Sequence, residues 1–412
     1  MEMKINLIIF LFLPIFLLSC SAQDLVVAEE TSLIITTASV DENLLLDVGI
    51  TEFEPGIPKK NDALKTGIYE EIRAAETKYL PYHLKTTLQG TGYWGAVRVI
   101  PSEKAFTDII IKGHIKRSDG EFIKIKFSVS DSSNLHWFTR TYETQTGLTS
   151  YSKRRDRRRD PYQKVFNDFA NDLQQYVNLL SRKKIKQTRQ ISELKFFQSM
   201  SPSVYENYLN LSEKGIISLL RLPAENDPYV GRLRKIRERD RLVVDTLNEH
   251  YANFYYGISI PYLNWRKTTR SENVKFRQEK QSAKMQALVG VIVLAGSTQI
   301  NTDSSSRNTR NIKRALQYQG ISRGVNTIFA AVRRSREAEL HLETIAELSD
   351  SFGSEAAPMV INIEGQERRL IGTAEAQFEG WRQILHEIYK AETGFSQSLE
   401  VGAPARSPDP TG

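Results

Sequence analysis

Short apolar runs and one alternating segment dominate the pattern of hydrophobic positions in the first half of the chain. Leu44–Ile50, Val97–Ile100 and Asp108–Ile115 have the length and composition typical of buried strands. Phe122–Val129 alternates apolar with polar residues, which indicates an antiparallel strand with one exposed face. Leu135–Tyr142 is expected to pair with it across a short turn. Together these segments predict a mixed β-sheet.

Two segments with helical periodicity are expected to pack on this sheet. Residues 66–90 place Ile72, Tyr79 and other apolar side chains on one face. Residues 161–181 begin with Pro161, which suits the first turn of a helix, and carry an apolar stripe of helical period. We therefore predict an α+β protein whose N-terminal unit, residues 44–182, is an α/β sandwich-type domain, a mixed sheet with packed helices.

After about residue 190 the period becomes helical, which predicts a mainly helical C-terminal domain over 190–396. Asp227-Pro228 is a cap and first-turn signal that opens a long helix, and Pro261 should end or kink it. Two apolar segments separated by Gly365-Gln366 predict a small β-hairpin near 358–371. Residues 397–412 are predicted to be a disordered tail. Periodicity predicts further helices at 264–296, 312–350 and 373–392.

The N-terminus has the pattern of a signal peptide and not of a membrane span. Leu7–Leu18 is apolar apart from Pro14 and about 12 residues long, whereas a spanning helix needs about 20. The run ends in Leu17-Leu18-Ser19-Cys20, which resembles the lipobox of bacterial lipoproteins. That resemblance implies removal of a signal peptide, residues 1–19, by cleavage between Ser19 and Cys20. It also implies that Cys20 then receives fatty-acyl chains such as palmitate.

The residue after the cysteine bears on where such a chain is held. Ser21 follows Cys20, where Asp would favour retention at the inner membrane, so resemblance to enterobacterial sorting favours the outer membrane and the periplasmic side. An ordinary secretory signal with a chance cysteine is the alternative. Against it, Cys20 is the only cysteine of the chain and lies at the cleavage position. Residues 20–43 are predicted to be the lipidated cysteine and its tether, with a short strand at Leu33–Thr37.

The predicted order of elements in residues 44–182 is strand, helix, strand, strand, hairpin and helix. With the opening Leu44–Val48 strand, a helix ending near Leu80-Pro81 and the Thr107–Ile115 stretch, this order resembles the periplasmic α/β domain of curli-secretion lipoproteins. It is also similar to the lipoprotein activators of penicillin-binding proteins and to the N-terminal domain of TolB-like proteins. The resemblance implies assembly, partner docking or a secretion ring. The secretion channels insert long amphipathic hairpins, and we find no matching pair of strands outside the domain's own hairpin.

Composition narrows the function classes. The 412 residues include 56 Lys and Arg against 49 Asp and Glu, and a net charge of +7 is too small to indicate a nucleic-acid binder. A single cysteine excludes a disulfide framework within the chain and a thiolate-based metal cluster. The expected partners are therefore the membrane, envelope proteins and a second copy of the chain.

The densest charge feature is a basic run between the last predicted strand and the helix at 161–181. One interpretation is a solvated loop. The other is a contact surface for anionic lipid headgroups, an acidic glycan or an acidic patch on a partner. The residues concerned are Lys153, Arg154, Arg155, Arg157, Arg158 and Arg159.

A second candidate contact lies in the apolar run 285–296. Ala287, Gly290 and Gly296 are small residues that suit close helix packing. Three interpretations remain open: a buried core helix, helix contact between protomers, and membrane insertion within an oligomer. About 12 residues cannot cross a bilayer as a straight helix.

Signatures of catalysis are absent from the sequence. The six histidines show no metal-binding spacing, and no nucleophile elbow, phosphate loop or dinucleotide fingerprint occurs. Asp108, Asp119 and Asp131 are the candidates for a carboxylate pair in glycan cleavage, although the last two fall at predicted turns. We therefore expect no catalytic residues, no metal and no cofactor apart from the covalent lipid on Cys20.

These patterns lead to one main functional expectation. The chain is expected to be an outer-membrane-anchored periplasmic lipoprotein that acts non-enzymatically, as an assembly or scaffold component or as an export-associated component of the bacterial envelope. One alternative is a regulator that activates a peptidoglycan synthase through protein contact. A second alternative is a peptidoglycan-acting enzyme.

Overall fold

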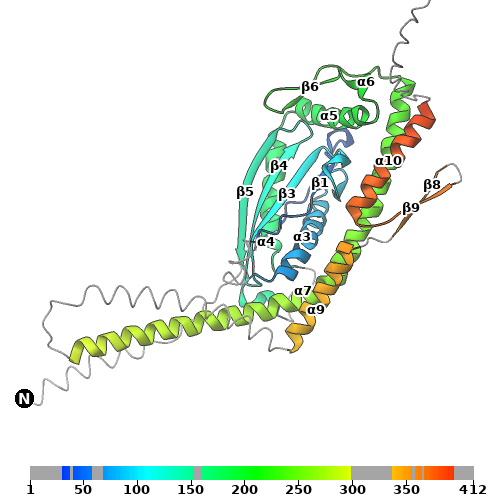
Figure 1. The fold of residues 1–412 in the computed structure, drawn as a ribbon. Coiled ribbons are helices and arrows are strands. Elements are labelled where there is room, and N and C mark those ends of the chain that lie inside the picture. The colour runs from blue at the N-terminus through cyan, green and yellow to red at the C-terminus, as the bar shows by residue number, and fades with distance from the viewer. Residues whose placement is uncertain are drawn as a thin grey trace, which may run out of the picture.

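A computed structural model describes residues 30–37, 40–57, 68–152, 159–297, 336–354, 358–363 and 366–393. Over these residues the predicted α+β class is confirmed, because a five-stranded mixed sheet with packed helices is followed by a helical region and two small antiparallel strand pairs (Figure 1). Ser19 and Cys20 of the predicted lipobox, residues 312–335 of the helix predicted over 312–350, and the tail 397–412 lie outside the described residues.

The sheet has the strand order β2-β1-β3-β4-β5. The strand β1 pairs in parallel with β2 and β3, while β3, β4 and β5 pair antiparallel. The predicted one-sided burial of β4 is confirmed, since buried residues alternate with partly exposed ones along it. All five predicted strands are therefore present: β1 Val48–Ile50, β2 Val97–Val99, β3 Ile109–Ser118, β4 Phe122–Asp131 and β5 His136–Gln145.

Helices α3, Glu70–Gly90, and α4, Gln163–Asn178, pack with the sheet as predicted. The expectation that the first helix ends near Leu80-Pro81 is wrong, because α3 continues for nine residues beyond Pro81 to Gly90. Proline lacks the N–H that would bond the carbonyl four residues earlier. That carbonyl, of Thr77, instead accepts a hydrogen bond from the Phe53 N–H at 2.9 Å. The segment after β1 thus satisfies the group that the proline leaves free.

Between residues 182 and 219 the structure contains elements that periodicity did not predict. Helix α5, Arg182–Met200, begins directly after α4 with Ser181 as its N-cap, and the short α6, Pro202–Tyr205, follows. Strands β6, Leu209–Leu211, and β7, Ile217–Leu219, form a second small hairpin. These strands are only three residues long, which is too short for an alternation pattern to identify them.

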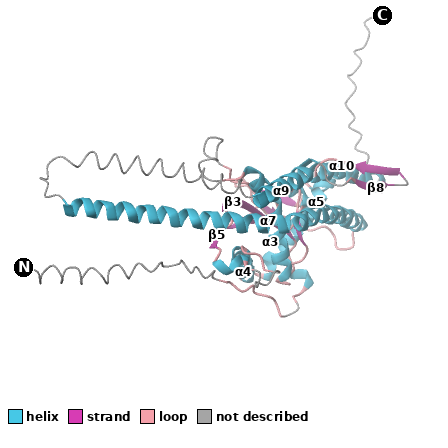
Figure 2. Cartoon of the chain, turned by 90° about the horizontal axis from the view of Figure 1, so that it is seen from below, coloured by secondary structure: helices cyan, strands magenta, loops and turns pink. Residues whose placement is uncertain are grey.

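Helix α7 runs without interruption from Pro228 to Ser297. Its start is confirmed, with the Asp227 carboxylate accepting a hydrogen bond from the Tyr229 N–H at 2.8 Å. Of the two outcomes predicted at Pro261, an end of the helix is wrong, because α7 continues through the proline and the two predicted helices are one. The other outcome, a kink, stays a prediction. Buried Ile258, Tyr262 and Trp265 flank the proline and hold both sides of it against the body. The last part of α7 extends beyond the rest of the described structure (Figure 2).

Helices α9, Arg336–Ser354, and α10, Ala374–Thr393, pack on α7. The predicted hairpin of β8, Met359–Ile363, and β9, Gln366–Leu370, is present between them in the chain, and β9 contacts α10. Trp381 Nε1 of α10 donates to Asp240 Oδ1 of α7 at 3.0 Å, and both side chains are buried. One cluster of buried apolar side chains extends from β1 to α10. The sheet and the helical region therefore share a continuous core.

The strand predicted at Leu33–Thr37 is wrong. Residues 31–36 join none of the sheets and lie instead beside α4, where the Asn171 side chain accepts a hydrogen bond from the Ile34 N–H at 2.9 Å. Side chains of α4 thus bond the backbone of Thr31, Ser32 and Ile34, and the Thr36 N–H bonds the Thr91 carbonyl at the end of α3.

Candidate functional site

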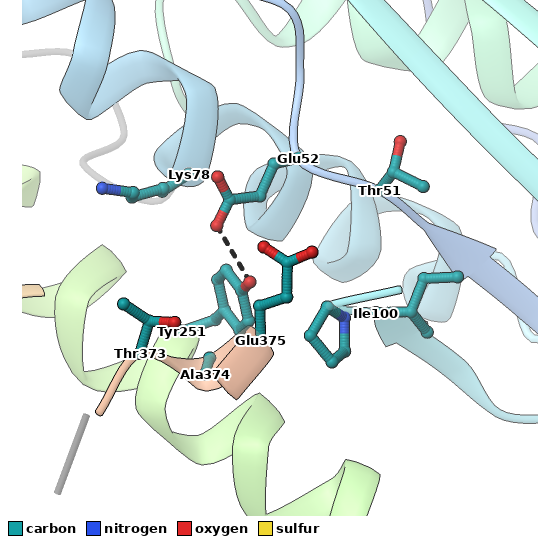
Figure 3. Close-up of a pocket in the computed structure, with 9 residues that line it drawn as sticks. Thr51, Glu52, Lys78, Ile100, Tyr251, Thr373, Ala374 and Glu375 are labelled. Atoms are coloured by element: carbon teal, nitrogen blue, oxygen red, sulfur yellow. Dashed lines mark hydrogen bonds between the residues drawn. The ribbon is translucent and has the colours of Figure 1, made fainter. Parts of the chain in front are cut away.

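A cavity of about 350 Å³ lies where the segment after β1 meets the beginning of α10 (Figure 3). It is lined by five parts of the chain: the segment after β1, helix α3, the segment after β2, helix α7 and the beginning of α10. Its size is at the lower end of the range for small-molecule sites. The lining residues are Thr51, Glu52, Lys78, Ile100, Pro101, Tyr251, Thr373, Ala374 and Glu375.

Two carboxylates give this cavity its chemical character. The side chains of Glu52 and Glu375 are directed toward the same part of the cavity, while the ammonium of Lys78 points away from it (Figure 3). Loss of hydration raises the pKa of the Glu52 carboxyl, and the Glu375 charge adds to this shift. The Lys78 charge and a hydrogen bond from the Tyr251 hydroxyl at 2.9 Å oppose it. The cavity therefore favours a positively charged or hydrogen-bond-donating group.

A buried ion pair fixes α7 to the segment that precedes α4. The Arg266 guanidinium donates to both carboxylate oxygens of Asp160, at 2.8 and 2.7 Å, and Arg266 is 1% exposed. Burial alone would raise the pKa of Asp160, but the Arg266 charge overrides it and holds that pKa well below its ordinary value. The guanidinium also lies over the rings of Tyr162 and Tyr262. The charged groups of this cluster therefore contact one another and stabilise the folded structure.

The turn between β3 and β4 is shaped by the passage of α7. Gly120 has a φ of +79°, and a Cβ there would lie 2.3 Å from the Arg266 carbonyl oxygen. Further along α7, Asn273 Nδ2 donates to the Asp119 carbonyl at 2.9 Å. These contacts place the point where α7 leaves the body at the β3–β4 turn.

A second buried network joins α3 to α7. Glu76 is 1% exposed and forms a 3.1 Å ion pair with Arg73 on its own helix. It also accepts hydrogen bonds from the Tyr262 hydroxyl, at 2.5 Å, and from the Ser118 hydroxyl. Burial raises the pKa of Glu76, and these partners oppose the shift. Its polar contacts are all to other parts of the fold, which is the pattern of a structural residue.

The structure separates Asp119, in the β3–β4 turn, from Asp108 and Asp131, which lie at the other end of β3 and β4. Asp119 accepts backbone hydrogen bonds within its turn, from the Glu121 and Phe122 N–H groups. Asp131 likewise bonds the backbone of its own turn and the Trp137 indole N–H. Asp108 is buried and accepts a hydrogen bond from the Asp47 N–H at 2.9 Å. Asp119 and Asp131 therefore stabilise the backbone of their own turns, while Asp108 joins the start of β3 to the residue before β1.

Asp108 is a buried carboxyl whose pKa is raised toward neutrality. Burial, followed by the neighbouring Asp47 charge, raises its pKa to about 6, while Arg237 and Arg189 act in the opposite direction. The Asp47 carboxylate itself is held by the Ala96 N–H and by the Arg241 guanidinium. Asp108 therefore changes its charge in a pH range in which the unfolding free energy of the whole protein can be measured.

Of the predicted basic run, the structure describes Arg159, and Lys153–Arg158 lie outside the described residues. The Arg159 guanidinium forms an ion pair with Glu30 at 2.9 Å, and both side chains are more than half exposed. Since Asp160 bonds Arg266, this pair lies next to the place where α7 leaves the body. The N-terminal segment and the free part of α7 thus meet the body at the same end.

The small residues Ala287, Gly290 and Gly296 all fall on the last part of α7. Their backbone is helical, as predicted, and this part of the helix extends beyond the described body (Figure 2). Among the described residues, no helix combines the length and the apolar content that crossing a membrane requires.

Sequence reasoning did not find the Glu52–Glu375 cavity. The two glutamates come from distant parts of the chain and belong to no motif, so no local signal marks them. In the part of the chain that the structure describes, no group of three or more histidine, cysteine, aspartate or glutamate side chains forms a candidate metal site. Comparisons with protein-family models, with curated proteins and with solved structures found no match to this chain.

Proposed function

We propose that the chain is an outer-membrane-anchored periplasmic lipoprotein that acts without catalysis, as an assembly, scaffold or export-associated component of the bacterial envelope. The observation that carries this proposal is α7, a 70-residue helix that is fixed in the body at one end and extends beyond it at the other. At 1.5 Å per residue its contour is about 105 Å. Such an element suits contact with another molecule or surface and does not enclose a substrate.

The first part of α7 is held rigidly enough to act as a support. Asn248 bonds the backbone of β2, and Arg266 bonds Asp160 in the interior. Tyr251, Tyr262 and Trp265 are each 1% exposed or less. Because these contacts come from several elements, force on the free part of α7 would be transmitted to the sheet.

The positions of the tether and of α7 support a membrane-proximal arrangement. Ten residues connect Cys20 to Glu30, and ten residues span at most about 35 Å. The part of α7 after Lys275, up to Ser297, rises about 33 Å. Both begin at the Arg159–Asp160 end of the body. A lipid on Cys20 and the apolar end of α7 can therefore reach the same membrane surface or a protein bound there.

The basic run is proposed as an auxiliary contact. Lys153, Arg154, Arg155, Arg157 and Arg158 directly precede Arg159 in the sequence, and Arg159 is paired with the tether. We infer that these side chains meet anionic lipid headgroups, where each contributes on the order of 1 kcal/mol at low salt. An acidic glycan and an acidic partner patch are the alternatives.

Membrane fractionation of the wild type and of Cys20→Ala tests the anchor. The wild type is expected in the outer-membrane fraction and the variant outside it, whereas an unchanged distribution would count against the proposal. In-cell photo-crosslinking from position 291, with position 278 on the same helix as the control, tests the scaffold. Crosslinks to a second copy or to envelope assembly proteins support it. Crosslinks to a peptidoglycan synthase without self-association favour the regulator.

The Glu52–Glu375 cavity favours a second candidate, a peptidoglycan-acting enzyme. Glycan-cleaving enzymes use two carboxyl groups whose environments separate their pKa values, and the raised pKa of Glu52 is the property of a general acid. Incubation of the purified protein with cell-wall sacculi tests this candidate. Release of soluble fragments that is lost in Glu52→Gln would favour the enzyme, and absence of release would leave the scaffold as the better account.

A further inference from the structure

Residues 31–36, which we call the strap, are held on α4 by two asparagine side chains one helical turn apart. Asn171 Oδ1 accepts a hydrogen bond from the Ile34 N–H at 2.9 Å, and its Nδ2 donates to the Ser32 carbonyl at 2.9 Å. Asn167 Nδ2 donates to the Thr31 carbonyl at 2.7 Å. A carboxamide carries both donor and acceptor groups, so Asn171 pairs with the backbone of the strap much as a neighbouring strand would.

The strap is attached at each end by one further contact. The Thr36 N–H donates to the Thr91 carbonyl at the end of α3, at 2.9 Å. Glu30, which precedes the strap, forms the 2.9 Å ion pair with Arg159. That pair is exposed on both sides, so solvent and salt weaken it. The attachment therefore depends mainly on backbone hydrogen bonds.

Few apolar groups of the strap are buried. Ile34 is 43% exposed and Ile35 is 61% exposed, while Leu33 packs partly against the core. Ordering the six residues costs conformational entropy, and a handful of hydrogen bonds with one leucine roughly offsets it. Because these favourable and unfavourable contributions nearly cancel, and no large hydrophobic contribution holds the strap on α4, its docking is reversible.

We propose that the strap is a reversible attachment that sets how far the body stands from its membrane anchor. This inference rests on the lipid anchor proposed for Cys20. With the strap docked, the free tether from Cys20 to Glu30 spans at most about 35 Å. When the strap is released, the next fixed point is Glu42, whose carbonyl accepts a hydrogen bond from Arg189 at 2.8 Å. Glu42 lies 22 residues after Cys20, and a fully extended chain of that length spans about 75 Å.

Release of the strap would roughly double the reach of the protein without moving the anchor. Docked, the body and the end of α7 are confined to the surface of the anchoring membrane. Released, the same body can meet partners deeper in the periplasm. The bonds of Asn167 and Asn171 are made to backbone atoms, so the strength of the attachment depends little on strap side chains.

Amide hydrogen exchange of the full-length lipoprotein in detergent tests the docking. The Ile34 and Thr36 amides are expected to exchange about 10- to 100-fold more slowly than unstructured amides, and faster than those of β3 and β4. Asn171→Ala and Ile34→Pro should abolish the slowing, because each removes one side of the Ile34 hydrogen bond. The matched controls Gln175→Ala, at an exposed position on α4, and Ile35→Pro should retain it at Thr36.

Energy transfer to labelled lipids tests the reach. A donor on Lys183→Cys, an exposed residue of α5, is the single reactive thiol when Cys20 is acylated. In vesicles that contain acceptor lipids, transfer is expected to fall in the Asn167→Ala/Asn171→Ala variant and to stay unchanged in Gln175→Ala. Strap amides without protection, strap amides as protected as β3, or equal transfer in wild type and double variant would each overturn the inference.

The two experiments separate this inference from the proposed function. A wild-type chain that fails to bind vesicles and carries an unmodified Cys20 removes the anchor and, with it, the reach. A vesicle-bound chain whose transfer ignores the asparagine variants leaves the anchor intact and overturns the strap alone. Exchange in β3 and β4 shows in every sample that the body is folded.

Discussion

The side chain of Asn248 bonds both backbone groups of Val99. Its Oδ1 accepts from the Val99 N–H at 2.9 Å, and its Nδ2 donates to the Val99 carbonyl at 2.9 Å. Val99 belongs to β2, an edge strand of the sheet, and Asn248 belongs to α7. Helix α7 therefore closes this edge in the way a further strand would, which protects it from pairing with other chains.

Replacement of Asn248 by alanine should leave two backbone groups of β2 without partners. Because Asn248 is 6% exposed, we expect a loss of about 2–4 kcal/mol in the free energy of unfolding. Urea denaturation measures it. Asn253→Ala, at an exposed position on the same helix, should change stability by less than about 0.5 kcal/mol. Equal stability of the two variants would show that α7 does not close the sheet edge.

Breaking the buried Asp160–Arg266 pair should cost much more unfolding free energy than breaking an exposed ion pair. Asp160→Ala leaves the Arg266 guanidinium buried without its counter-charge, and the expected cost is about 3–5 kcal/mol of unfolding free energy. Glu143→Ala removes an exposed partner of Lys124 and should cost less than about 1 kcal/mol. Thermal or urea unfolding of both variants checks this difference. A small effect at Asp160 would mean that α7 is not fixed to the segment that precedes α4.

Asp108 predicts a specific dependence of stability on pH. Its pKa is raised to about 6 in the folded protein, so the folded state holds the proton more tightly than the unfolded chain does. Its contribution to stability is present below about pH 4 and is lost as the pH rises through about 6. Relative to the wild type, Asp108→Asn should therefore gain about 2–3 kcal/mol between pH 4 and pH 7.5. A difference between the two proteins that stays constant across this range would contradict the assignment.

The Glu52 cavity predicts two opposite pKa changes. Glu375→Gln removes a negative charge that raises the pKa of Glu52, so that pKa should fall. Lys78→Met removes a positive charge that lowers it, so the same pKa should rise. Carbon-13 NMR titration of the Glu52 carboxyl measures both changes. Shifts in the same direction, or none, would show that the three side chains do not share the cavity as Figure 3 places them.

The local pattern of apolar and polar residues was sufficient to predict the elements that neighbouring residues alone identify. Alternation identified β4, and the Asp227-Pro228 cap located the start of α7 within one residue. Both signals arise within a few neighbouring residues, and tertiary contacts reinforce them. The fold class could therefore be predicted without knowledge of the packing.

Helical periodicity over 66–90 located α3, whereas the expectation that a helix ends at Pro81 or at Pro261 was wrong. At Pro81, the carbonyl freed by the proline accepts the Phe53 N–H from another segment, so α3 continues. At Pro261, buried residues on both sides keep α7 helical. In each case a contact that is distant in sequence offsets the local cost of the proline.

The candidate sites also differ in whether a local sequence motif marks them. The Glu52–Glu375 cavity and the asparagine contacts of the strap join distant segments, and no motif marks either. The lipobox-like segment Leu17–Cys20 is the opposite case, since it is a purely local sequence signal and lies outside the described residues. The proposed cellular setting thus rests on the sequence, while the position of α7 rests on the structure.

Mass spectrometry of the native polypeptide, extracted from membranes without chemical treatment, tests the central claim most directly. The account predicts a chain that begins at Cys20, with a diacylglyceryl group on its sulfur and a third acyl chain on its amino group. A chain that begins elsewhere, or one with an unmodified thiol at Cys20, would contradict it.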